Sequence, residues 1–355
     1  MLYQKDYTFY TYINDVKGKF EARTGSWVGP FSVLYIDNPV LAGYSFSSSG
    51  LRKTQKEYGQ DLYEFVQQFY NLFPHLLAID LYIGGQSYAG KYVPVLAHWI
   101  HSSRQNAPTR IPLRGLYIGG PLFAPAVMFP ENFEHLYNVG AISEHQRTTG
   151  RKQTQDLVDR YLTGELDPAD TIRQILPLIF GTQVPSYENY VTGENVDGER
   201  FTAIMTSDRL RKALHVGSLD YVAINNTFFF QLYSDIMSDT RDKLSELLDA
   251  GEYKVLIYSG DVDVMVSVAM VEAALLATPW SGRGAYENST RRPWYGPPSP
   301  TSNRRPLYGY YSKTSQLCRV VVRGAGHQTP HDQPAISREM MLQFVHDDCV
   351  GTMAT

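Results

Sequence analysis

The chain has 355 residues, which is enough for one large α/β domain with an insertion or for two ordinary domains. Hydrophobic residues make up 43% of it and charged residues 19%, as is typical of a globular protein that can fill a core. The formal net charge of −4 argues against nucleic-acid binding, which needs a clustered basic surface. No run of about 18 apolar residues predicts a membrane span, and the first residues contain no apolar stretch of signal-peptide length.

The cysteines and the glycosylation sequons are the features of the sequence that bear on the cellular compartment of the protein. The two cysteines, Cys318 and Cys349, could form a disulfide bond or stay reduced, and their spacing does not decide between these states. The sequons at Asn225 and Asn288 predict two positions for N-glycans and hint at a secretory route.

The first part of the chain alternates between strand-like and helical patterns. The aromatic run at residues 7–13 predicts a strand, and residues 32–37 are apolar enough for a strand buried on both faces. The turn signal Asn38-Pro39 follows. Apolar side chains then recur at helical spacing through residues 57–73 and stop at Pro74, which predicts an amphipathic helix.

A second strand–helix unit contains Ser87. Residues 81–86 predict a strand, residues 92–100 a helix, and residues 113–119 the next strand. This alternation predicts an α/β fold with a mostly parallel central sheet and right-handed crossovers.

The alternation stops at residues 123–206, which hold helical pieces such as 143–161 and 168–178 but no convincing buried strand. We interpret residues 123–206 as a helical lid inserted into a core made of residues 1–122 and 207–355. In the second part of this core we expect the following elements: helices at 206–214 and 226–248, a strand at 254–258, a loop at 281–306, a hairpin of residues 307–311 and 317–322, and a last helix at 339–345.

Ser87 lies at the predicted corner between a strand and a helix, with the small residues Gly85 and Ala89 on either side. Such a corner exposes a serine hydroxyl and directs the N–H groups of the following helix toward a developing negative charge. A serine among glycines is by itself more often a plain turn. Further residues are therefore needed to support a nucleophile.

An acidic residue and a histidine follow two later core strands. The acid is Asp261 or Asp263 and the histidine is His327, so the order along the chain is serine, acid, histidine. This is the order of the α/β-hydrolase fold. A histidine can take the serine proton, and a buried carboxylate can fix the tautomer of the histidine.

Metal binding is the alternative reading of these residues. The two aspartates could be calcium ligands, but no further acidic spacing supports a calcium loop. His327 and His331 are four residues apart, but Pro330 lies between them and no Glu follows His327. We expect no metal and no cofactor.

The chain resembles the serine carboxypeptidases, in particular the vitellogenic-like branch. Residues 85–94 read G-Q-S-Y-A-G-K-Y-V-P, where the family has G-E-S-Y-A-G-K-Y-V-P. Further blocks of the family match Y-I-D-N-P at 35–39, A-L-H-V-G at 213–217, Y-S-G-D-V-D at 258–263 and G-A-G-H at 324–327. The similarity runs from about Tyr7 to the C-terminus.

The resemblance implies an enzyme of the secretory pathway that removes single residues from peptide C-termini at acidic pH. It implies Ser87 as the nucleophile, Asp263 as the acid and His327 as the base. It also implies the N–H of Tyr88 as an oxyanion donor, and we expect Gln86 and Asn38 to contact the substrate.

The sequence departs from the family at two places. The strand that ends in W-x-x-G-G-P-G and supplies the second oxyanion donor is not found upstream of Asn38, and Gln86 stands where the family usually has Glu. The hypotheses are therefore a working carboxypeptidase that forms an acyl-enzyme on Ser87, an acyltransferase on the same triad, or a catalytically impaired homologue that binds peptides or partners.

Overall fold

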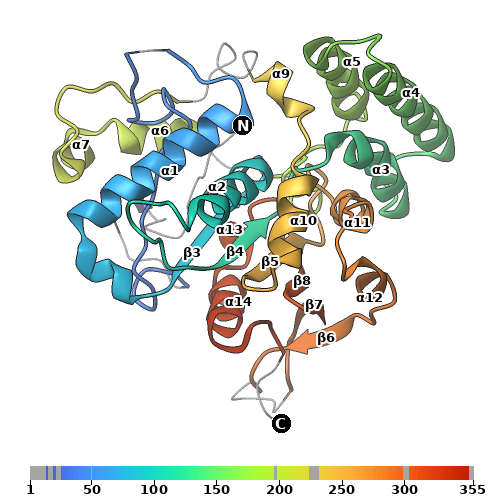
Figure 1. Ribbon diagram of the computed structural model, residues 1–355. Helices are drawn as coiled ribbons and strands as arrows, with labels where there is room; N and C mark the ends of the chain where they lie inside the picture. Colours follow the sequence, from blue (N-terminus) through green and yellow to red (C-terminus); the bar gives the residue numbers. More distant parts are fainter. Residues whose placement is uncertain are drawn as a thin grey trace.

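The computed structural model describes residues 13–14, 19–20, 25–48, 50–195, 198–223, 232–298 and 304–351. Its centre is a six-stranded sheet with the strand order β3-β4-β5-β8-β7-β6 (Figure 1). β3 (Leu81–Gln86), β4 (Leu113–Gly119), β5 (Lys254–Gly260) and β8 (Leu317–Val322) are parallel. β7 (Leu307–Thr314) and β6 (Arg292–Tyr295) continue the sheet in antiparallel pairing. The predicted mostly parallel sheet is therefore confirmed.

Helices cover both faces of this sheet. On one face lie α1 (Gln55–Leu72), α2 (Ala89–Ser103), α10 (Arg241–Asp249) and α11 (Val268–Leu276), whose apolar side chains join one core cluster. α14 (Pro334–Asp347) covers the other face and contributes to a second cluster. The central strand β5 has side chains in both clusters, with Val255 and Ile257 in the first and Leu256 and Tyr258 in the second. Its run of apolar residues is explained by this two-sided burial.

The predicted helix at residues 57–73 is confirmed as α1, and its start is fixed by a capping box. The Thr54 side chain accepts a hydrogen bond from the N–H of Glu57, whose carboxylate accepts from the N–H of Thr54. The helix ends before Pro74, which opens the short 3₁₀ helix η1 (Pro74–Ala78).

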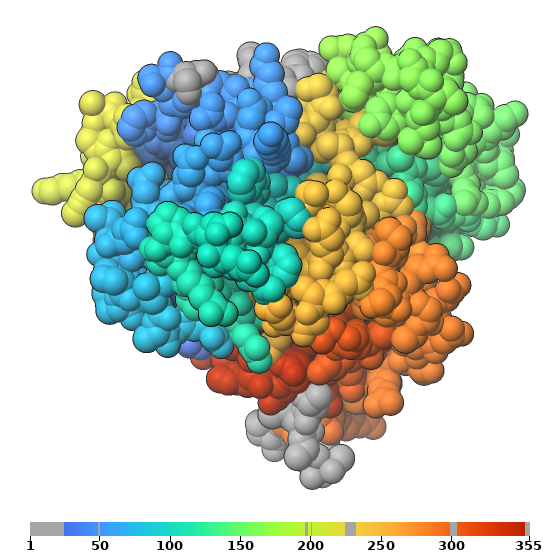
Figure 2. Space-filling model, in the orientation of Figure 1, coloured from blue at the N-terminus to red at the C-terminus, as the bar shows by residue number. Residues whose placement is uncertain are grey.

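Between β4 and residue 223, the regular elements of the described residues are helices. They are α3 (Pro125–Asn138), α4 (Glu144–Leu162), α5 (Pro168–Phe180), α6 (Gly198–Met205) and α7 (Asp208–Leu214). The helices predicted at 143–161, 168–178 and 206–214 are thus confirmed. α3 to α5, in green, form a continuous lobe at the upper right of Figure 2. The division into a core and a lid at residue 123 stays a prediction.

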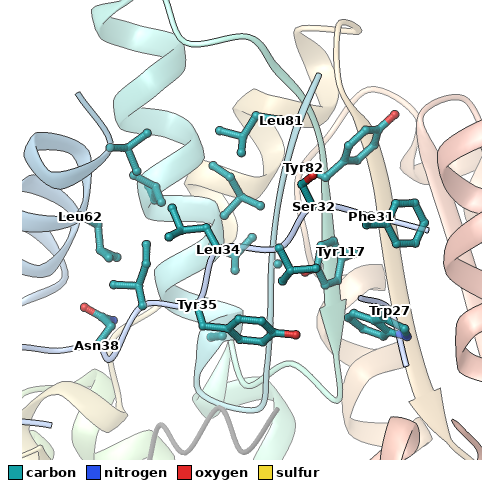
Figure 3. A pocket seen from close by; sticks show the side chains of 18 of the residues that line it. Trp27, Phe31, Ser32, Leu34, Tyr35, Asn38, Leu62, Leu81, Tyr82 and Tyr117 are labelled. Atoms are coloured by element: carbon teal, nitrogen blue, oxygen red, sulfur yellow. The ribbon is translucent and has the colours of Figure 1, made fainter. Parts of the chain in front are cut away.

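The strand predicted at residues 32–37 does not form. These residues have no regular secondary structure and belong to a segment, residues 30–38, that lines a cavity of about 840 Å³. Residues 79–84, which include most of β3, and Leu62 of α1 also line it (Figure 3). An isolated extended segment cannot satisfy a strand's hydrogen bonds, so its apolar pattern alone does not make a strand. The run at residues 7–12 lies outside the described residues, and Ile13 belongs to the two-residue strand β1 (Ile13–Asn14), which pairs with β2 (Lys19–Phe20).

The long helix predicted at residues 226–248 is also wrong. Residues 226–231 lie outside the described part of the chain, and the rest forms two helices, α9 (Tyr233–Ile236) and α10. The break between them is held by tertiary contacts: Lys91 donates to the carbonyl oxygens of Ile236 and Ser238, and the N–H of Thr240 donates to Phe123.

The loop predicted at 281–306 contains two regular elements, α12 (Arg283–Glu287) and the edge strand β6. β6 forms in spite of Pro293 because an edge strand tolerates a missing N–H, and its Trp294 is fully buried. The strand at 254–258, the hairpin and the last helix are confirmed as β5, β7 with β8, and α14.

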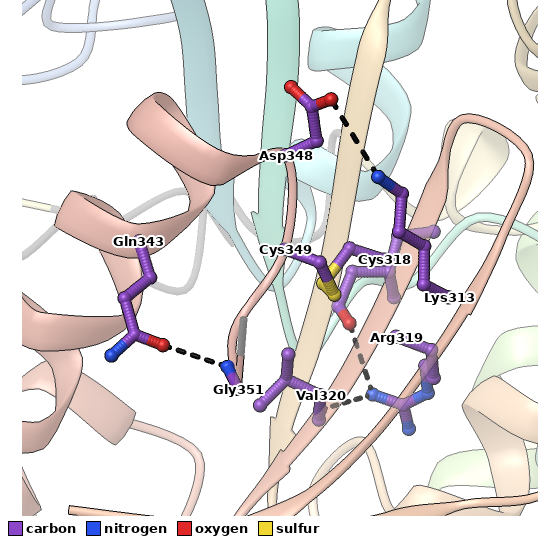
Figure 4. The surroundings of a disulfide bond; sticks show 9 residues. Lys313, Cys318, Arg319, Val320, Gln343, Asp348, Cys349 and Gly351 are labelled. Atoms are coloured by element: carbon purple, nitrogen blue, oxygen red, sulfur yellow. Dashed lines mark hydrogen bonds and ion pairs between the residues drawn. A yellow bond between two sulfur atoms is a disulfide. The ribbon is translucent and has the colours of Figure 1, made fainter. Parts of the chain in front are cut away.

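The two cysteines form a disulfide bond between β8 and the chain just after α14 (Figure 4). The Cα atoms of Cys318 and Cys349 are 5.4 Å apart, and both residues are fully buried. An ion pair between Lys313 and Asp348 and a hydrogen bond from the N–H of Gly351 to Gln343 lie beside it. The sequence had left the state of these cysteines open.

Candidate functional site

Ser87 lies on a sharp corner between β3 and α2 and has a positive φ of 61°. This left-handed conformation costs a non-glycine residue about 1–3 kcal/mol and persists only where the surroundings enforce it. Here they do so through the main chain: the N–H of Ser87 donates to Gly119 (2.8 Å), and its carbonyl accepts from Gly90 and Leu122 (both 2.9 Å). The corner is therefore fixed against the loop that follows β4.

Two glycines permit the close approach of these loops. A side chain at Gly90 would lie 2.7 Å from the backbone nitrogen of Leu122. Gly120 has a positive φ of 45°, and a Cβ there would lie 3.1 Å from the Asp263 carboxylate and 3.2 Å from Nδ1 of His327. The loop after β4 thus bridges the Ser87 corner and the Asp263–His327 pair.

Asp263 and His327 are in direct contact. The distance between His327 Nδ1 and Asp263 Oδ2 is 2.8 Å, and the other carboxylate oxygen accepts from the N–H groups of Met265 (2.8 Å) and Val266 (2.9 Å). Asp263 is fully buried and His327 is 5% exposed. A carboxylate fixed in this way holds the proton of the imidazole on Nδ1 and leaves Nε2 as the proton acceptor.

Asp261, the other candidate acid, faces a different group. Its carboxylate accepts a hydrogen bond from the N–H of Gly324 (2.6 Å), which ties the loop after β5 to the loop after β8. Burial raises the pKa of Asp261. Of the two aspartates, only Asp263 contacts the histidine.

The environment of His327 favours its protonated form. Burial opposes the positive charge, but the charge and hydrogen bond of Asp263, together with the charge of Glu188, outweigh it and raise the pKa of His327. The imidazole is therefore a stronger base than a histidine in water. Among the described residues, no hydrogen bond joins the Ser87 hydroxyl to His327, and such bonds are often long before a substrate is bound.

A segment between α5 and α6 passes against the loops that carry both residues of this pair. The N–H of His327 donates to the carbonyl of Glu188 (2.6 Å). The N–H of Tyr190 donates to Val262, and Tyr187 accepts from Val264 (both 3.3 Å). Residues 187–190 thus hold the loop that carries Asp263 and the loop that carries His327 next to each other.

Gln86, next to the serine, is directed toward the histidine loop. Its side-chain amide donates to the carbonyl oxygen of His327 and to Oε1 of Gln328 (2.9 Å). Gln328 in turn donates to the Glu188 carboxylate at 3.4 Å. Gln86 therefore belongs to a polar chain that runs along the site.

The two remaining candidate residues, Tyr88 and Asn38, lie in different surroundings. Tyr88 follows the serine at the N-terminus of α2, where its N–H has no backbone acceptor among the described residues. Asn38 lines the cavity beside β3, together with Gly84 and Ala89 but not with Gln86 or Ser87. In the described part of the chain no hydrogen bond joins Asn38 to Ser87 or His327, and its contact with the substrate stays a prediction.

Sequence reasoning missed Glu188 and Gln328. Gln328 could have been found as the neighbour of His327, since the loop that carries a base also lines its site. Glu188 gave no signal, because it lies about a hundred residues from Ser87 in a segment without a motif.

Within the described ranges, no group of three or more His, Cys, Asp or Glu residues could hold a metal ion. In the same ranges, no helix has the length and hydropathy needed to cross a membrane.

The sequence matches known proteins over almost its whole length. The profile of the family described as serine carboxypeptidase, Peptidase_S10, matches residues 10–347. "Probable serine carboxypeptidase CPVL" from Mus musculus is 32% identical, covering 92% of this chain and 70% of that protein. "Vitellogenic carboxypeptidase" from Aedes aegypti is 29% identical, covering 91% of this chain and 69% of that protein.

A solved structure supports the same fold. KEX1(delta)p, a prohormone-processing carboxypeptidase from Saccharomyces cerevisiae, superposes with a TM-score of 0.79 at 20% identity, covering 93% of this chain and 77% of that one. This likeness confirms the predicted α/β-hydrolase fold. The match of the family profile to residues 10–347 confirms the predicted membership and shows that the chain is an enzyme of the serine carboxypeptidase family.

Proposed function

We propose that this enzyme removes single residues from the C-termini of peptides through an acyl-enzyme on Ser87. The observation that carries the proposal is the buried Asp263–His327 hydrogen bond, at 2.8 Å. This pair lies against Gly120, in the loop after β4 that also holds the strained Ser87 corner. Family membership supports carboxypeptidase activity in general and favours it over the alternative of a binding protein.

In the first step, Nε2 of His327 takes the proton of the Ser87 hydroxyl as Oγ attacks the carbonyl carbon of the last peptide bond. Asp263 keeps the other imidazole proton on Nδ1 and stabilises the imidazolium. The imidazolium then protonates the leaving amino group, so that the C-terminal residue departs and an ester remains on Ser87. Water hydrolyses this ester by the same proton transfers in reverse order.

The oxyanion formed in each half-reaction is stabilised by the N–H of Tyr88 at the N-terminus of α2. The positive end of the helix dipole adds to this donor. The family motif that supplies a second donor is not found in the sequence, and the loss of one donor typically lowers kcat by about 10² to 10³. We therefore propose a slow enzyme.

The free carboxylate of the substrate is bound by the Gln86 amide. The amide now donates to two acceptors, the carbonyl oxygen of His327 and Oε1 of Gln328, and we propose that the carboxylate replaces Oε1 of Gln328, at 2.9 Å. An amide donates at any pH, in contrast to a carboxyl group, which must be protonated to do so.

We also propose that the protein passes through the secretory pathway. The buried disulfide bond supports an oxidising compartment, and relatives include a "Venom serine carboxypeptidase" from Apis mellifera. Of the two sequon positions, Asn288 is exposed at the end of α12, and Asn225 lies outside the described residues. A mass loss on treatment with an N-glycosidase that is smaller in Asn288→Gln than in the wild type would support a glycan at this position.

Labelling with a fluorophosphonate probe tests the proposal, because only an activated serine reacts. We expect labelling of the wild-type protein, none of Ser87→Ala, and unchanged labelling of Ser32→Ala, which alters an exposed serine. Turnover should be seen with a peptide that has a free C-terminus and not with its C-terminal amide. Folded wild-type protein that takes up no probe between about pH 4.5 and 7.5 would refute the proposal.

A further inference from the structure

A buried cluster of polar side chains lies directly behind the Ser87 corner, and none of these side chains has a role in the chemistry described above. It consists of Tyr88, Lys91, Asp235 and Gln55, which come from the start of α2, from α9 and from the start of α1. Tyr88 is 2% exposed, Lys91 0% and Asp235 4%. Burying so many polar groups is unfavourable unless they are paired, so their contacts indicate what the cluster holds together.

Asp235 is the centre of the cluster. Its Oδ2 accepts hydrogen bonds from the Tyr88 hydroxyl and from the side-chain amide of Gln55. Burial and the Asp235 charge raise the pKa of Tyr88 well above its usual value, so the phenol keeps its proton and remains a donor. The side chain of the residue that follows the serine is thereby tied to α9.

Lys91 forms the second tie. Burial lowers the pKa of Lys91 to about 7. Its side-chain nitrogen donates to the carbonyl oxygens of Ile236 (3.0 Å) and Ser238 and lies 3.0 Å from the Ser238 hydroxyl, and the protonated form has the three N–H donors that these contacts use. Thr240 adds a hydrogen bond from its hydroxyl to the carbonyl of Gly90 (3.2 Å). The first turn of α2 is thus attached through side chains to α9 and to the loop that follows it.

These ties act at the place where the corner is strained. Main-chain hydrogen bonds fix Ser87 itself, but they leave the direction of the Tyr88 N–H dependent on the first turn of α2. An oxyanion donor is effective only when it is held in position before the reaction. We propose that Asp235 and Lys91 are positioning residues, which hold the first turn of α2 so that the Tyr88 N–H points at the oxyanion.

This inference rests on the proposed function, and it predicts two effects that the proposed function alone does not. Loosening the ties should lower kcat while KM stays nearly constant, because the oxyanion exists only in the transition state and the intermediates. It should also speed hydrogen exchange of the amides at 87–91, whether or not the protein is active.

The chain offers a matched pair of variants. Tyr88→Phe removes the hydroxyl that donates to Asp235. Tyr92→Phe removes a buried hydroxyl that has no hydrogen-bond partner among the described residues. The centroids of the Tyr88 and Tyr92 rings are 5.4 Å apart, so both changes are made in the same surroundings. Both changes delete one oxygen and leave the rings in place.

For Tyr88→Phe we expect kcat to fall about tenfold with KM within about twofold, and amide exchange at 87–91 to quicken about tenfold. Tyr92→Phe should match the wild type in both measurements. Asp235→Asn, which keeps an acceptor for the phenol, should retain more activity than Asp235→Ala.

Equal kcat and exchange in the two tyrosine variants would overturn the inference, as would faster exchange with unchanged kcat. If the wild-type protein has no activity, the proposed function fails. Hydrogen exchange alone then tests whether the Tyr88 hydroxyl holds the start of α2 against α9. A rise specific to Tyr88→Phe then supports this tie, and no rise overturns it.

Discussion

At the scale of single residues, Gln86 and His327 both indicate a working range nearer to neutral pH than the acidic range that the family resemblance implies. The amide of Gln86 can donate to a carboxylate at any pH, so the binding that we propose for it does not depend on protonation of this side chain. His327 must be deprotonated to act as a base, and its raised pKa raises the pH below which we expect activity to fall. Two independent features thus shift the pH dependence in the same direction.

Replacing Gln86 with Glu should make substrate binding depend on acid. The new carboxyl group would face two acceptors, the carbonyl oxygen of His327 and Oε1 of Gln328, and only its protonated form could donate to them or to a substrate carboxylate. We expect KM of Gln86→Glu to rise as pH increases from about 4.5 to 7.5, while KM of the wild type stays nearly constant. Gln60→Glu, an exposed change on α1, serves as the control. The same pH profile of KM in Gln86→Glu and the wild type would contradict this role of Gln86.

Replacing Glu188 with Gln should extend activity to lower pH. The charge of Glu188 contributes to the raised pKa of His327, so neutralising it lowers that pKa and lets the imidazole stay deprotonated in more acidic solution. We expect the acidic limb of the kcat/KM profile to move to lower pH in Glu188→Gln. Glu194→Gln, an exposed change in the same segment, should leave the limb in place. A limb that does not move, or moves equally in both variants, argues against this coupling.

At the scale of elements, local sequence patterns predicted helices and strands correctly where each element has a partner to pair with or pack against. α1, β4, β5 and the β7–β8 hairpin follow from periodicity and turns. The order of Ser87, an acid at Asp261 or Asp263, and His327 led to the candidate site, and the family resemblance selected Asp263. Residues 32–37 have an equally good strand pattern but line a cavity instead of pairing. The break between α9 and α10 depends on Lys91, more than a hundred residues earlier, and Glu188 reaches His327 only through the fold. Contacts of this kind cannot be read from local sequence.

The disulfide bond attaches the end of α14 to the central strand β8, and its loss should destabilise the protein. The closed loop spans 31 residues, for which the chain-entropy estimate is about 3–4 kcal/mol. We expect Cys318→Ala with Cys349→Ala to lower the free energy of unfolding by about this amount in urea titrations. A reducing agent should destabilise the wild type and leave the double variant unchanged, because the chain has no other cysteine. Equal stability of both proteins under oxidising conditions would contradict this role of the bond.

At the scale of the whole molecule, stability should decrease across the sheet toward β3. β5 and β8 have a strand on each side and helices on both faces, whereas β3 is an edge strand whose residues 81–84 line the cavity. The lost packing along a cavity and the single strand neighbour both make local opening easier. Ser87, the proposed nucleophile, therefore follows the strand that we expect to be the least stable of the four parallel strands.

Hydrogen exchange under native conditions measures this gradient. We expect the amides of β5 and β8 to exchange only through global unfolding, so that their protection falls in parallel with the free energy of unfolding when urea is added. Protection of β3 should be lower and nearly independent of urea, as is typical of local opening. β6 is the comparison, since it is the other edge strand, does not line the cavity and carries the fully buried Trp294. If β3 and β6 are equally protected, edge position alone sets the gradient; if β3 is as protected as β5, the cavity does not weaken this side of the sheet.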